Sequence, residues 1–412
     1  MENTNSNQSS EKKSILDQII TNHQREEVEK LDAVEIANNL FNELNERERD
    51  VLTRRFGLHG GEKETLENIG NAHKLTRERI RQIETSGVKK LRLLKNLEEH
   101  INGLRKVINQ LLEEHGGLME KEYLLNNLVN FSVGGLNKKK EDVDLHKNHL
   151  DFLISRLLHD FFEEVNNSKY FKESFKLKHQ TLDHLEEIVN ELVDKIKELK
   201  QIYATEDLIK IFTELESYNN HQDKLEVPNN LDISNILVND LFHEDADLIN
   251  NNKVIYSLIQ ASKHIEQNKF GHWGIFDWKE VKPKTINDKI YLVLKNNGKP
   301  MHFVDITKKI NQISFDEKEA NAATVHNELI LDNKYVLVGR GLYSLVEWGY
   351  KRGTVVDVIK DILNENGKPL TRDEIIEKVL EQRLVKKATI ILALMDKNSF
   401  EKVDNRYILK NQ

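Results

Sequence analysis

A duplication in the C-terminal part of this 412-residue chain constrains its fold more than any other feature. Three landmarks recur there in the same order. They are Gly298-Lys299-Pro300 and Gly367-Lys368-Pro369, 69 residues apart, Ala323-Thr324-Val325 and Ala388-Thr389-Ile390, 65 apart, and Tyr343 and Tyr407, 64 apart. Such a series indicates a repeated module in which one loop has lost a few residues.

Each copy has the pattern of a winged helix, with a helix, a Gly-Lys-Pro turn, two further helices and a β-hairpin. The alternation in KYVLVGRGLYSL, with Gly339-Arg340-Gly341 at the turn, predicts a two-stranded wing. Arg340 at its tip is a candidate for contact with a minor groove or a phosphate. The alternative for Arg340 is a solvated turn.

The same order of elements recurs, more weakly, in the middle of the chain. One candidate module runs from LLEEHGGLMEKEYLLNNL through LDFLISRLLHDFF to KYFKESFKL, and another from IYATEDLIKIF to FGHWGIFDW. The alternative is a plain helical spacer. Trp273, Trp278 and Trp348 are interpreted as core residues at module junctions rather than as stacking platforms.

A helix-turn-helix is predicted near the N-terminus. Apolar residues recur at helical spacing from Asp32 to Leu44, and a second helix ends near Gly57. Thr65 and Thr76 are N-cap residues for a short helix and a long one. The short helix should bury Leu66, Ile69 and Ala72, and the long one Ile80, Ile83, Val88 and Leu91.

The fold class is therefore mainly α, a helix-turn-helix domain followed by an array of winged-helix modules with small β-hairpin wings. The expected domains are a disordered tail at 1–28, the helix-turn-helix at 29–96, helical segments at 97–180 and 181–283 that are candidates for degenerate winged helices, and winged helices at 284–350 and 351–412.

Charge is distributed unevenly along the chain. Residues 76–95 hold seven basic and two acidic side chains, a net +5, whereas the whole chain is −8 and the remainder is therefore −13. A basic helix on an acidic body suits local DNA binding. The alternative is a solvated helix face.

Three segments, ELNERERDVLTRRFGL, TLENIGNAHKL and TRERIRQIE, resemble the fourth conserved region of primary-type bacterial sigma factors, over about residues 29–95. The resemblance implies that Arg77, Glu78 and Gln82 contact bases in the major groove of a −35-like promoter element. It also implies backbone contacts, which position the protein without reading sequence. The phosphate-contacting candidates are Arg47, Arg55, Thr65, Thr76, Arg79 and Arg81.

The chain also departs from the sigma pattern. Thr85, Ser86 and Gly87 follow Glu84 where the family has Ala and Lys, and a glycine within a helix costs about 1 kcal/mol relative to alanine. About 28 residues precede the region, without Trp, Tyr or Phe, so we expect no promoter-melting region. Engagement of the RNA polymerase core through its β flap is the implied partner contact.

A second resemblance lies in the duplicated part. TINDKIYLVLKNNGKPMHFVDITKKI followed by NAATVHNELILDNKYVLVGRGLYSLVEWGY is similar to the HARE-HTH winged-helix family, which includes the amino-terminal domain of the RNA polymerase delta subunit. The copy at 353–410 resembles a divergent member. This resemblance implies contacts with DNA or with polymerase.

Several classes of function are disfavoured. The chain has no Cys, which excludes Cys-ligated zinc, and GGEKET lacks the Lys-Ser/Thr ending of a P-loop. His146 and His149, near Asp144 and Asp151, could form a metal face, but their charged surroundings favour solvated histidines in a loop. We expect no enzyme activity, cofactor, metal or membrane contact. A polar start without a secretion signal predicts a cytoplasmic, nucleoid-associated protein.

Three functional hypotheses remain. The first is a sequence-specific, sigma-like regulator that binds double-stranded DNA, and the second is a delta-like polymerase adaptor that acts mainly through protein contacts. The third is a nucleoid-type bridger that binds DNA regardless of sequence, with a steep salt dependence.

Overall fold

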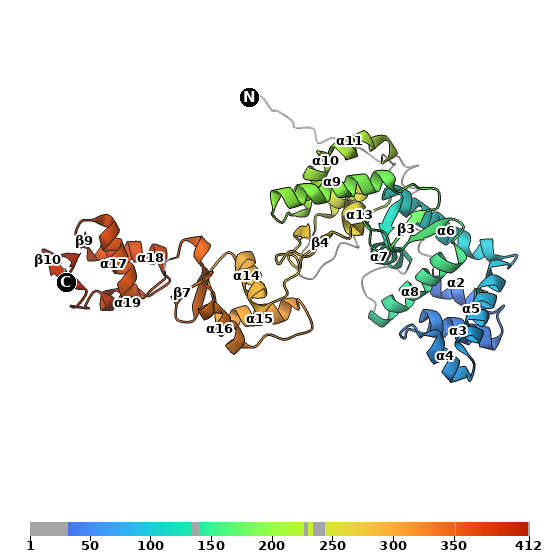
Figure 1. Ribbon diagram of the computed structural model, residues 1–412, viewed down its shortest axis with the longest axis horizontal. Helices are drawn as coiled ribbons and strands as arrows, with labels where there is room; N and C mark the ends of the chain where they lie inside the picture. The colour runs from blue at the N-terminus through green and yellow to red at the C-terminus, as the bar shows by residue number, and fades with distance from the viewer. Residues whose placement is uncertain (1–31, 133–139, 226–229, 234–243, 351, 411–412) are drawn as a thin grey trace, which may run out of the picture. The chain divides into compact units, whose positions relative to one another are not determined.

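The computed structural model describes residues 32–132, 140–225, 230–233, 244–350 and 352–410 (Figure 1). The expected disordered tail at 1–28 lies outside the described residues. The chain divides into two compact units, residues 1–266 and 267–412. The fold class is the predicted one, since helices predominate and the sheets are small and antiparallel.

The described part of the first unit begins with four helices, drawn in blue in Figure 1. They are α2 (Ala33–Phe41), α3 (Glu46–Phe56), α4 (Leu66–His73) and α5 (Arg77–Arg92). Asp32 caps α2, and α3 ends at Gly57, whose φ of 67° is the left-handed conformation that glycine adopts without strain. These boundaries agree with the sequence prediction.

The next part of the first unit has the element order of a winged helix. Its elements are α6 (Leu97–Glu114), β1 (Leu118–Glu120), α7 (Lys121–Ser132), α8 (Lys140–Phe152), the π-helical turn η1 (Leu153–Leu157), β2 (Phe162–Val165) and β3 (Ser174–Leu177). The sheet has the order β1-β3-β2, with both pairs antiparallel. Strand β1 is thus added to the hairpin of β2 and β3, which forms the wing.

The remainder of the first unit is mostly helical. Its elements are α9 (Asp183–Leu199), α10 (Thr205–Thr213), α11 (Glu216–Asn220), η2 (Gln222–Lys224), α12 (Ala246–Asn251) and α13 (Lys253–Ala261), and β4 (Ile265–Gln267) lies at the division between the units. A buried ion pair joins α13 to α6, because Lys253 Nζ lies 2.7 Å from Glu114 Oε2. Glu114 also accepts a hydrogen bond from the amide of Leu231, so its carboxylate is satisfied at several points.

The second unit contains both copies of the duplicated module. After β5 (Trp273–Ile275), the first copy comprises α14 (Ile286–Asn297), β6 (Met301–His302), α15 (Phe303–Ile313), α16 (Ala322–Leu331), β7 (Tyr335–Gly339), β8 (Leu342–Leu345) and η4 (Val346–Trp348). The second comprises α17 (Val355–Asn366), β9 (Leu370–Thr371), α18 (Arg372–Gln382), α19 (Lys387–Ala393), β10 (Phe400–Val403) and β11 (Arg406–Leu409).

The two copies share their topology in detail. Their sheets have the orders β6-β8-β7 and β9-β11-β10, the same arrangement as β1-β3-β2 in the first unit. In both copies a threonine opens the first helix with a capping box, Thr285 with Asp288 and Thr354 with Asp357. The short strand after the Gly-Lys-Pro turn was not anticipated from the sequence.

The second copy covers an edge of the first copy's wing. The amide of Leu384 donates to the carbonyl of Val338 at 3.2 Å, and Arg383 Nη1 donates to the carbonyl of Leu337 at 2.9 Å. In the sheet order β6-β8-β7, strand β7 is an edge strand whose outer groups would otherwise remain unpaired. The second copy therefore satisfies part of this edge.

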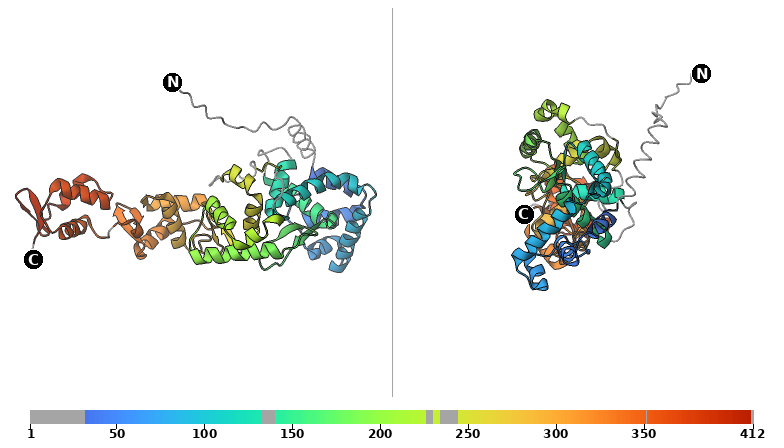
Figure 2. Two further views of the ribbon diagram at one scale, coloured as in Figure 1. Left: turned by 90° about the horizontal axis from the view of Figure 1, so that it is seen from above. Right: turned by 90° about the vertical axis from the view of Figure 1, so that its right-hand side faces the viewer.

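Aromatic packing holds the N-terminal helices to α8 in the first unit. Phe152, at the end of α8, is 1% exposed, and its ring centroid lies 5.6 Å from that of Phe41 and 4.9 Å from that of Phe56. Helix α8 lies beside α2 (Figures 1 and 2). Burial of these rings is the main stabilising contribution at this junction.

The three tryptophans are only partly consistent with core positions. Trp273 is buried at 1% exposure, whereas Trp278 and Trp348 are intermediate. Trp348 packs against the core of the first copy. None of the helices in the described ranges has the length and hydropathy needed to cross a membrane.

Replacing Phe152 with alanine should lower the free energy of unfolding of the first unit by about 3–5 kcal/mol, since the change removes a large buried ring and leaves a cavity. Thermal or urea unfolding of the full chain measures the effect. The matched control is Leu93→Ala, because Leu93 is 72% exposed and its removal should change stability little. Equal effects of the two substitutions would contradict the proposed importance of the aromatic junction.

Candidate nucleic-acid interface

The candidate interface is built on the amino-terminal end of α5. Thr76 is the N-cap, and its Oγ1 accepts a hydrogen bond from the backbone amide of Arg79 at 3.3 Å. Thr65 caps α4 in the same way, through the amide of Asn68. Each cap satisfies one of the free amides that a helix start leaves exposed, which is why these helices begin where they were predicted to begin.

A tight turn sets the angle between α4 and α5. Lys74 adopts the left-handed conformation at φ 54°, and the amide of Leu75 donates to the carbonyl of Gly70 at 2.8 Å. A Cβ atom on Gly70 would lie only 2.8 Å from the carbonyl oxygen of Leu75. Glycine at this position therefore allows the chain to close the helix-turn-helix.

The core side of α5 agrees with the prediction. Ile80 and Leu91 are fully buried, and Ile83 and Val88 nearly so. In α4, Ile69 is buried as expected, but Ala72 is exposed and Gly70 is buried instead. The expected inward position of Ala72 was wrong, because the side of α4 that faces the turn carries Gly70 rather than Ala72.

The candidate base-contacting side chains all point away from this core. Arg77, Glu78 and Gln82 are exposed. Arg81 donates to both carboxylate oxygens of Glu78, at 2.9 and 2.7 Å, and Arg79 Nη1 donates to Gln82 Oε1 at 3.1 Å. Two of the three base-contacting candidates are thus bonded to neighbouring arginines on the same helix.

These pairs also tune the acidity of the exposed carboxylate. The hydrogen bond from Arg81 is the largest cause that lowers the pKa of Glu78 below its ordinary value, and the charge of Arg77 acts in the same direction. The same bond raises the pKa of Arg81. Glu78 is therefore an ionised acceptor at neutral pH, as a contact with a base amino group requires.

The phosphate-contacting candidates occupy different surroundings. Arg47 and Arg79 line one groove of about 1040 Å³ beside α5, together with Gln82 and Ser86. Arg55 is bonded within the protein, because its Nε lies 3.6 Å from Glu84 Oε2 and its Nη1 donates to the carbonyl of Glu64 at 3.0 Å. Thr65, Thr76, Arg79 and Arg81 are exposed.

Gly87 has a packing role in α5. A Cβ atom at this position would lie 3.2 Å from Leu52 Cδ1 on α3, closer than an ordinary van der Waals contact. Lys90 of α5, one turn later, forms a 2.7 Å ion pair with Glu48 of α3. The missing side chain at Gly87 therefore lets α3 and α5 approach closely, which offsets the weaker helix propensity of glycine.

Sequence reasoning missed a polar network between α3 and α4. Asp50 accepts from Arg54 Nε at 3.0 Å and lies 2.7 Å from His73 Nε2, and Arg54 also reaches Glu64. The spacing of four between Asp50 and Arg54 was a signal that could have revealed the first of these contacts. His73 could not have been placed without the fold.

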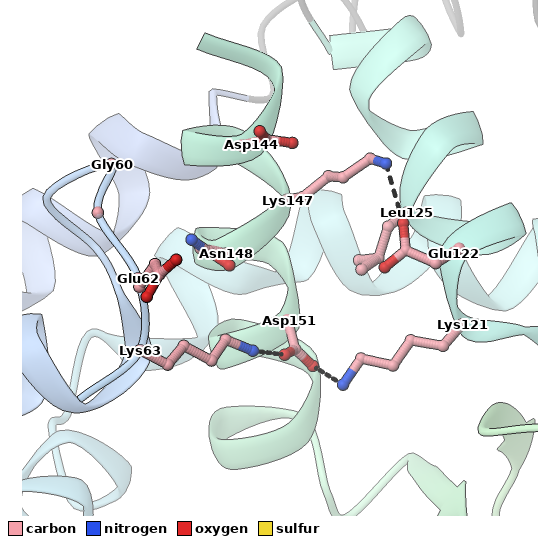
Figure 3. A pocket seen from close by; sticks show the side chains of 11 residues that line it. Gly60, Glu62, Lys63, Lys121, Glu122, Leu125, Asp144, Lys147, Asn148 and Asp151 are labelled. Atoms are coloured by element: carbon pink, nitrogen blue, oxygen red, sulfur yellow. Dashed lines mark hydrogen bonds and ion pairs between the residues drawn. The ribbon is translucent and has the colours of Figure 1, made fainter. Parts of the chain in front are cut away.

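The helix-turn-helix is tied to the following winged-helix part by charged side chains (Figure 3). Asp151 of α8 lies between two lysines, with its carboxylate oxygens 2.7 Å from Lys63 Nζ and 2.6 Å from Lys121 Nζ. Asn148 adds a hydrogen bond to the carbonyl of Gly57 at 3.1 Å. These residues line a polar cavity of about 400 Å³. Burial, the largest single influence, raises the pKa of Asp151, but the hydrogen bonds and charges of Lys121 and Lys63 together lower it below its ordinary value.

The prediction that His146 and His149 are solvated histidines in a charged loop was wrong. Residues 140–152 form α8 rather than a charged loop, and both His146 and His149 are buried in it. Each donates a hydrogen bond from its Nδ1 to the backbone carbonyl four residues earlier, that of Asp142 for His146 and that of Leu145 for His149. Burial lowers the pKa of His149. No metal-binding group of three or more His, Asp or Glu side chains occurs among the residues that the structure describes.

Arg340, the candidate wing contact, lies at the turn between β7 and β8 and is exposed. The following Gly341 has a φ of 68°, and a Cβ atom there would collide with the ring of His302. The wing tip therefore packs closely on the start of α15 while Arg340 projects into solvent.

Comparison with known proteins assigns the helix-turn-helix part. Residues 40–93 match the family described as Sigma-70, region 4, a DNA-binding domain that interacts with RNA polymerase in sigma factors. Similar proteins include the RNA polymerase sigma factors SigA of Nostoc sp., 46% identical over 76 residues, of Lactococcus lactis subsp. cremoris, 57% over 49 residues, and of Microcystis aeruginosa, 54% over 54 residues.

These likenesses are local. They cover 18%, 12% and 13% of this chain, and 17%, 14% and 13% of the respective relatives. The chain thus spans less than a fifth of the length of these curated relatives. No solved structure matches the chain as a whole or in part. The shared part is the helix-turn-helix whose geometry is described above.

Replacing Arg81 with methionine should raise the pKa of Glu78 toward its ordinary value, because the hydrogen bonds from Arg81 are the largest cause of its lowering. An NMR titration of the Glu78 side-chain carboxyl in the free protein measures the shift. Lys89→Met, further along the same exposed helix, is the control and should leave Glu78 unchanged. An unchanged pKa in the Arg81 variant would mean that the pair does not persist in solution.

Proposed function

We propose that this protein is a DNA-binding transcription regulator that recognises a −35-like promoter element with α5. In this proposal Arg77, Glu78 and Gln82 contact base edges, and Arg47, Arg55, Thr65, Thr76, Arg79 and Arg81 contact the phosphate backbone. The domain acts in transcription initiation by engaging RNA polymerase through the β flap.

The observation that carries the proposal is the separation of the two sides of α5. Ile80 and Ile83 are buried, whereas the polar residues between and around them are exposed at the capped amino-terminal end. A recognition helix enters the major groove with this end first. The match to Sigma-70, region 4 over residues 40–93 supports the same assignment.

Of the three residues proposed to contact bases, Arg77 forms the fewest contacts in the free protein. Among the described residues its side chain forms no hydrogen bond or ion pair, whereas Glu78 and Gln82 are held by Arg81 and Arg79. In the complex, Arg81 and Arg79 would turn toward phosphates and release the carboxylate and the amide to the bases. The exposed pairs are weak enough for such an exchange.

The C-terminal modules at 284–350 and 351–412 are proposed to be HARE-HTH-type winged helices, and 97–180 and 181–283 degenerate ones. Their shared strand order supports a common origin for the first of these middle segments and the two C-terminal copies. Arg340, at the tip of the wing, is proposed to contact DNA.

A delta-like adaptor that acts mainly through protein contacts is the second candidate, and one observation favours it. Helix α16, the third helix of the first C-terminal copy, carries no Lys or Arg and exposes Ile330 and Leu331, at 60% and 77%. A helix without cations is poorly suited to a phosphate backbone, and exposed apolar side chains suit a protein surface. This module would then bind polymerase while α5 binds DNA or polymerase.

A mobility-shift experiment without polymerase separates the two candidates. The purified full chain should shift a duplex that contains a −35 element if it is a sequence-specific regulator. A chain that shifts this duplex only in the presence of RNA polymerase core is an adaptor. A shift of every duplex alike, with a steep salt dependence, would indicate a sequence-blind bridger.

Replacing Arg77 with alanine should weaken binding to the cognate site by about 1–3 kcal/mol and relax discrimination at one base pair, because a bidentate guanine contact is lost. Competition binding with single-base variants of the site measures both effects. Arg372→Ala, which removes an exposed arginine from α18, is the control and should leave the preference unchanged. An equal loss on every duplex would rule out a base-reading role for Arg77.

A further inference from the structure

The exposed surface of α5 continues well beyond its reading end. Residues 77, 81, 85, 89 and 92 follow one another at spacings of four or three, which keeps them on one face of a helix. These residues, Arg77, Arg81, Thr85, Lys89 and Arg92, are all exposed. The proposed reading residues thus lie at one end of a largely basic line, and Arg92 lies at the other.

At this far end the line meets the winged-helix part of the same unit. Arg92 Nε donates a hydrogen bond of 2.6 Å to the carbonyl of Arg156 in η1. The guanidinium of Arg156 lies over the ring of Phe56, 5.4 Å from its centroid, and the residue remains exposed. A guanidinium stacked on a ring keeps its N–H edge free for an anion. Both arginines are therefore held in place before any ligand arrives.

Positive charge is in excess around this junction. Asp160 pairs with His159 at 3.3 Å and with Lys178 at 3.7 Å. Among the described residues, neither Arg92 nor Arg156 has a carboxylate within ion-pair distance. Burial, as the largest cause, and the charge of Arg156 both lower the pKa of Arg92, and Asp160 only partly opposes them. Two crowded guanidiniums without carboxylate partners form a site for an anion.

We propose that Arg92, Arg156 and Lys178 form a phosphate-binding strip that extends the DNA contact of α5 onto the winged-helix part of the first unit. The strip recognises the phosphate backbone without reading sequence. The inference rests on the proposed function, because it takes α5 to be the helix that enters DNA. It assigns a DNA contact to Arg156 and Lys178, which lie outside the residues that match Sigma-70, region 4.

The length of α5 supports a backbone contact at this end. Its 16 residues span about 24 Å, which is about twice the width of the major groove. When the amino-terminal end reaches the bases, the carboxyl-terminal end lies beside the strand that borders the groove. Arg92 and its neighbours are therefore placed at phosphates rather than at base edges.

In this proposal the winged-helix part of the first unit contacts the phosphate backbone through the strip and does not read bases. Its third helix, α8, is packed against α2 and cannot enter a groove, since Phe152 is buried between Phe41 and Phe56. Exposed cations that can reach DNA in this part occur after α8, both in η1 and directly after β3. Arg156 and Lys178 occupy these two segments.

The test measures duplex binding of the full chain at several salt concentrations, with a −35-containing duplex and a scrambled one. The variant carries Arg156→Gln and Lys178→Gln, both at exposed positions. Affinity should fall by the same factor on both duplexes, and the slope of log K against log salt should decrease by about 2, roughly one for each lost phosphate contact. The matched control, Lys195→Gln with Lys197→Gln on α9, should keep the wild-type slope.

A charge-conserving variant checks that folding is not the cause. Arg156→Lys with Lys178→Arg should retain most of the wild-type slope, because a phosphate contact needs the charge more than the exact side chain. An unchanged slope in the glutamine variant overturns the strip. So does a normal slope with weakened binding of RNA polymerase core, which would assign these residues to an acidic protein surface.

The experiment also separates this inference from the proposed function. If the wild-type chain prefers the −35-containing duplex and loses that preference with Arg77→Ala, α5 reads DNA whatever the strip does. An unchanged slope in the glutamine variant then rejects the strip alone. If the wild-type chain binds neither duplex, the proposed function and the strip both fail.

Discussion

The packing of Phe152 between Phe41 and Phe56 is the contact on which the arrangement of the first unit depends. It joins a helix of the winged-helix part to the helices that support α5. The buried rings supply most of the stabilisation at this junction. The ion pairs of Asp151 with Lys63 and Lys121 lie beside them and orient the two parts of the unit, so they need not stabilise the junction on their own. The position of η1 beside the end of α5 follows from this junction, and so does the meeting of Arg92 with Arg156.

The winged-helix topology is used in more than one way in this chain. In the first unit the third helix, α8, is committed to a contact within the protein, and its histidines His146 and His149 are buried. In the first C-terminal copy the third helix, α16, is exposed but has no cation. The outer edge of that copy's wing is covered in part by Leu384 of the second copy. A shared strand order therefore does not imply a shared surface for DNA, since the side chains on each helix decide what it can contact.

The sequence predictions succeeded where a single local cause determined the structure. Thr65 and Thr76 begin helices because a hydroxyl cap is a local interaction, and Gly57 ends one because it adopts a left-handed conformation cheaply. They failed where two distant surfaces meet. The segment around His146 has the charge pattern of a loop, but contact with α2 buries it as a helix, and the ion pair of Lys253 with Glu114 joins residues 139 apart in the chain.

In α5, too, some features follow from the local sequence and others from contacts between distant parts of the chain. The sequence alone determined that Arg77, Glu78 and Gln82 lie opposite Ile80 and Ile83, since helical periodicity fixes which side chains share a face. It also determined the duplication and the mainly α fold class, because repeated landmarks and caps are written in the order of residues. Only the tertiary structure decided that Gly87 is a close contact with Leu52 and that the basic end of α5 meets Arg156. These depend on how helices far apart in the sequence pack, and packing is set by the fit of whole surfaces, which no local pattern contains.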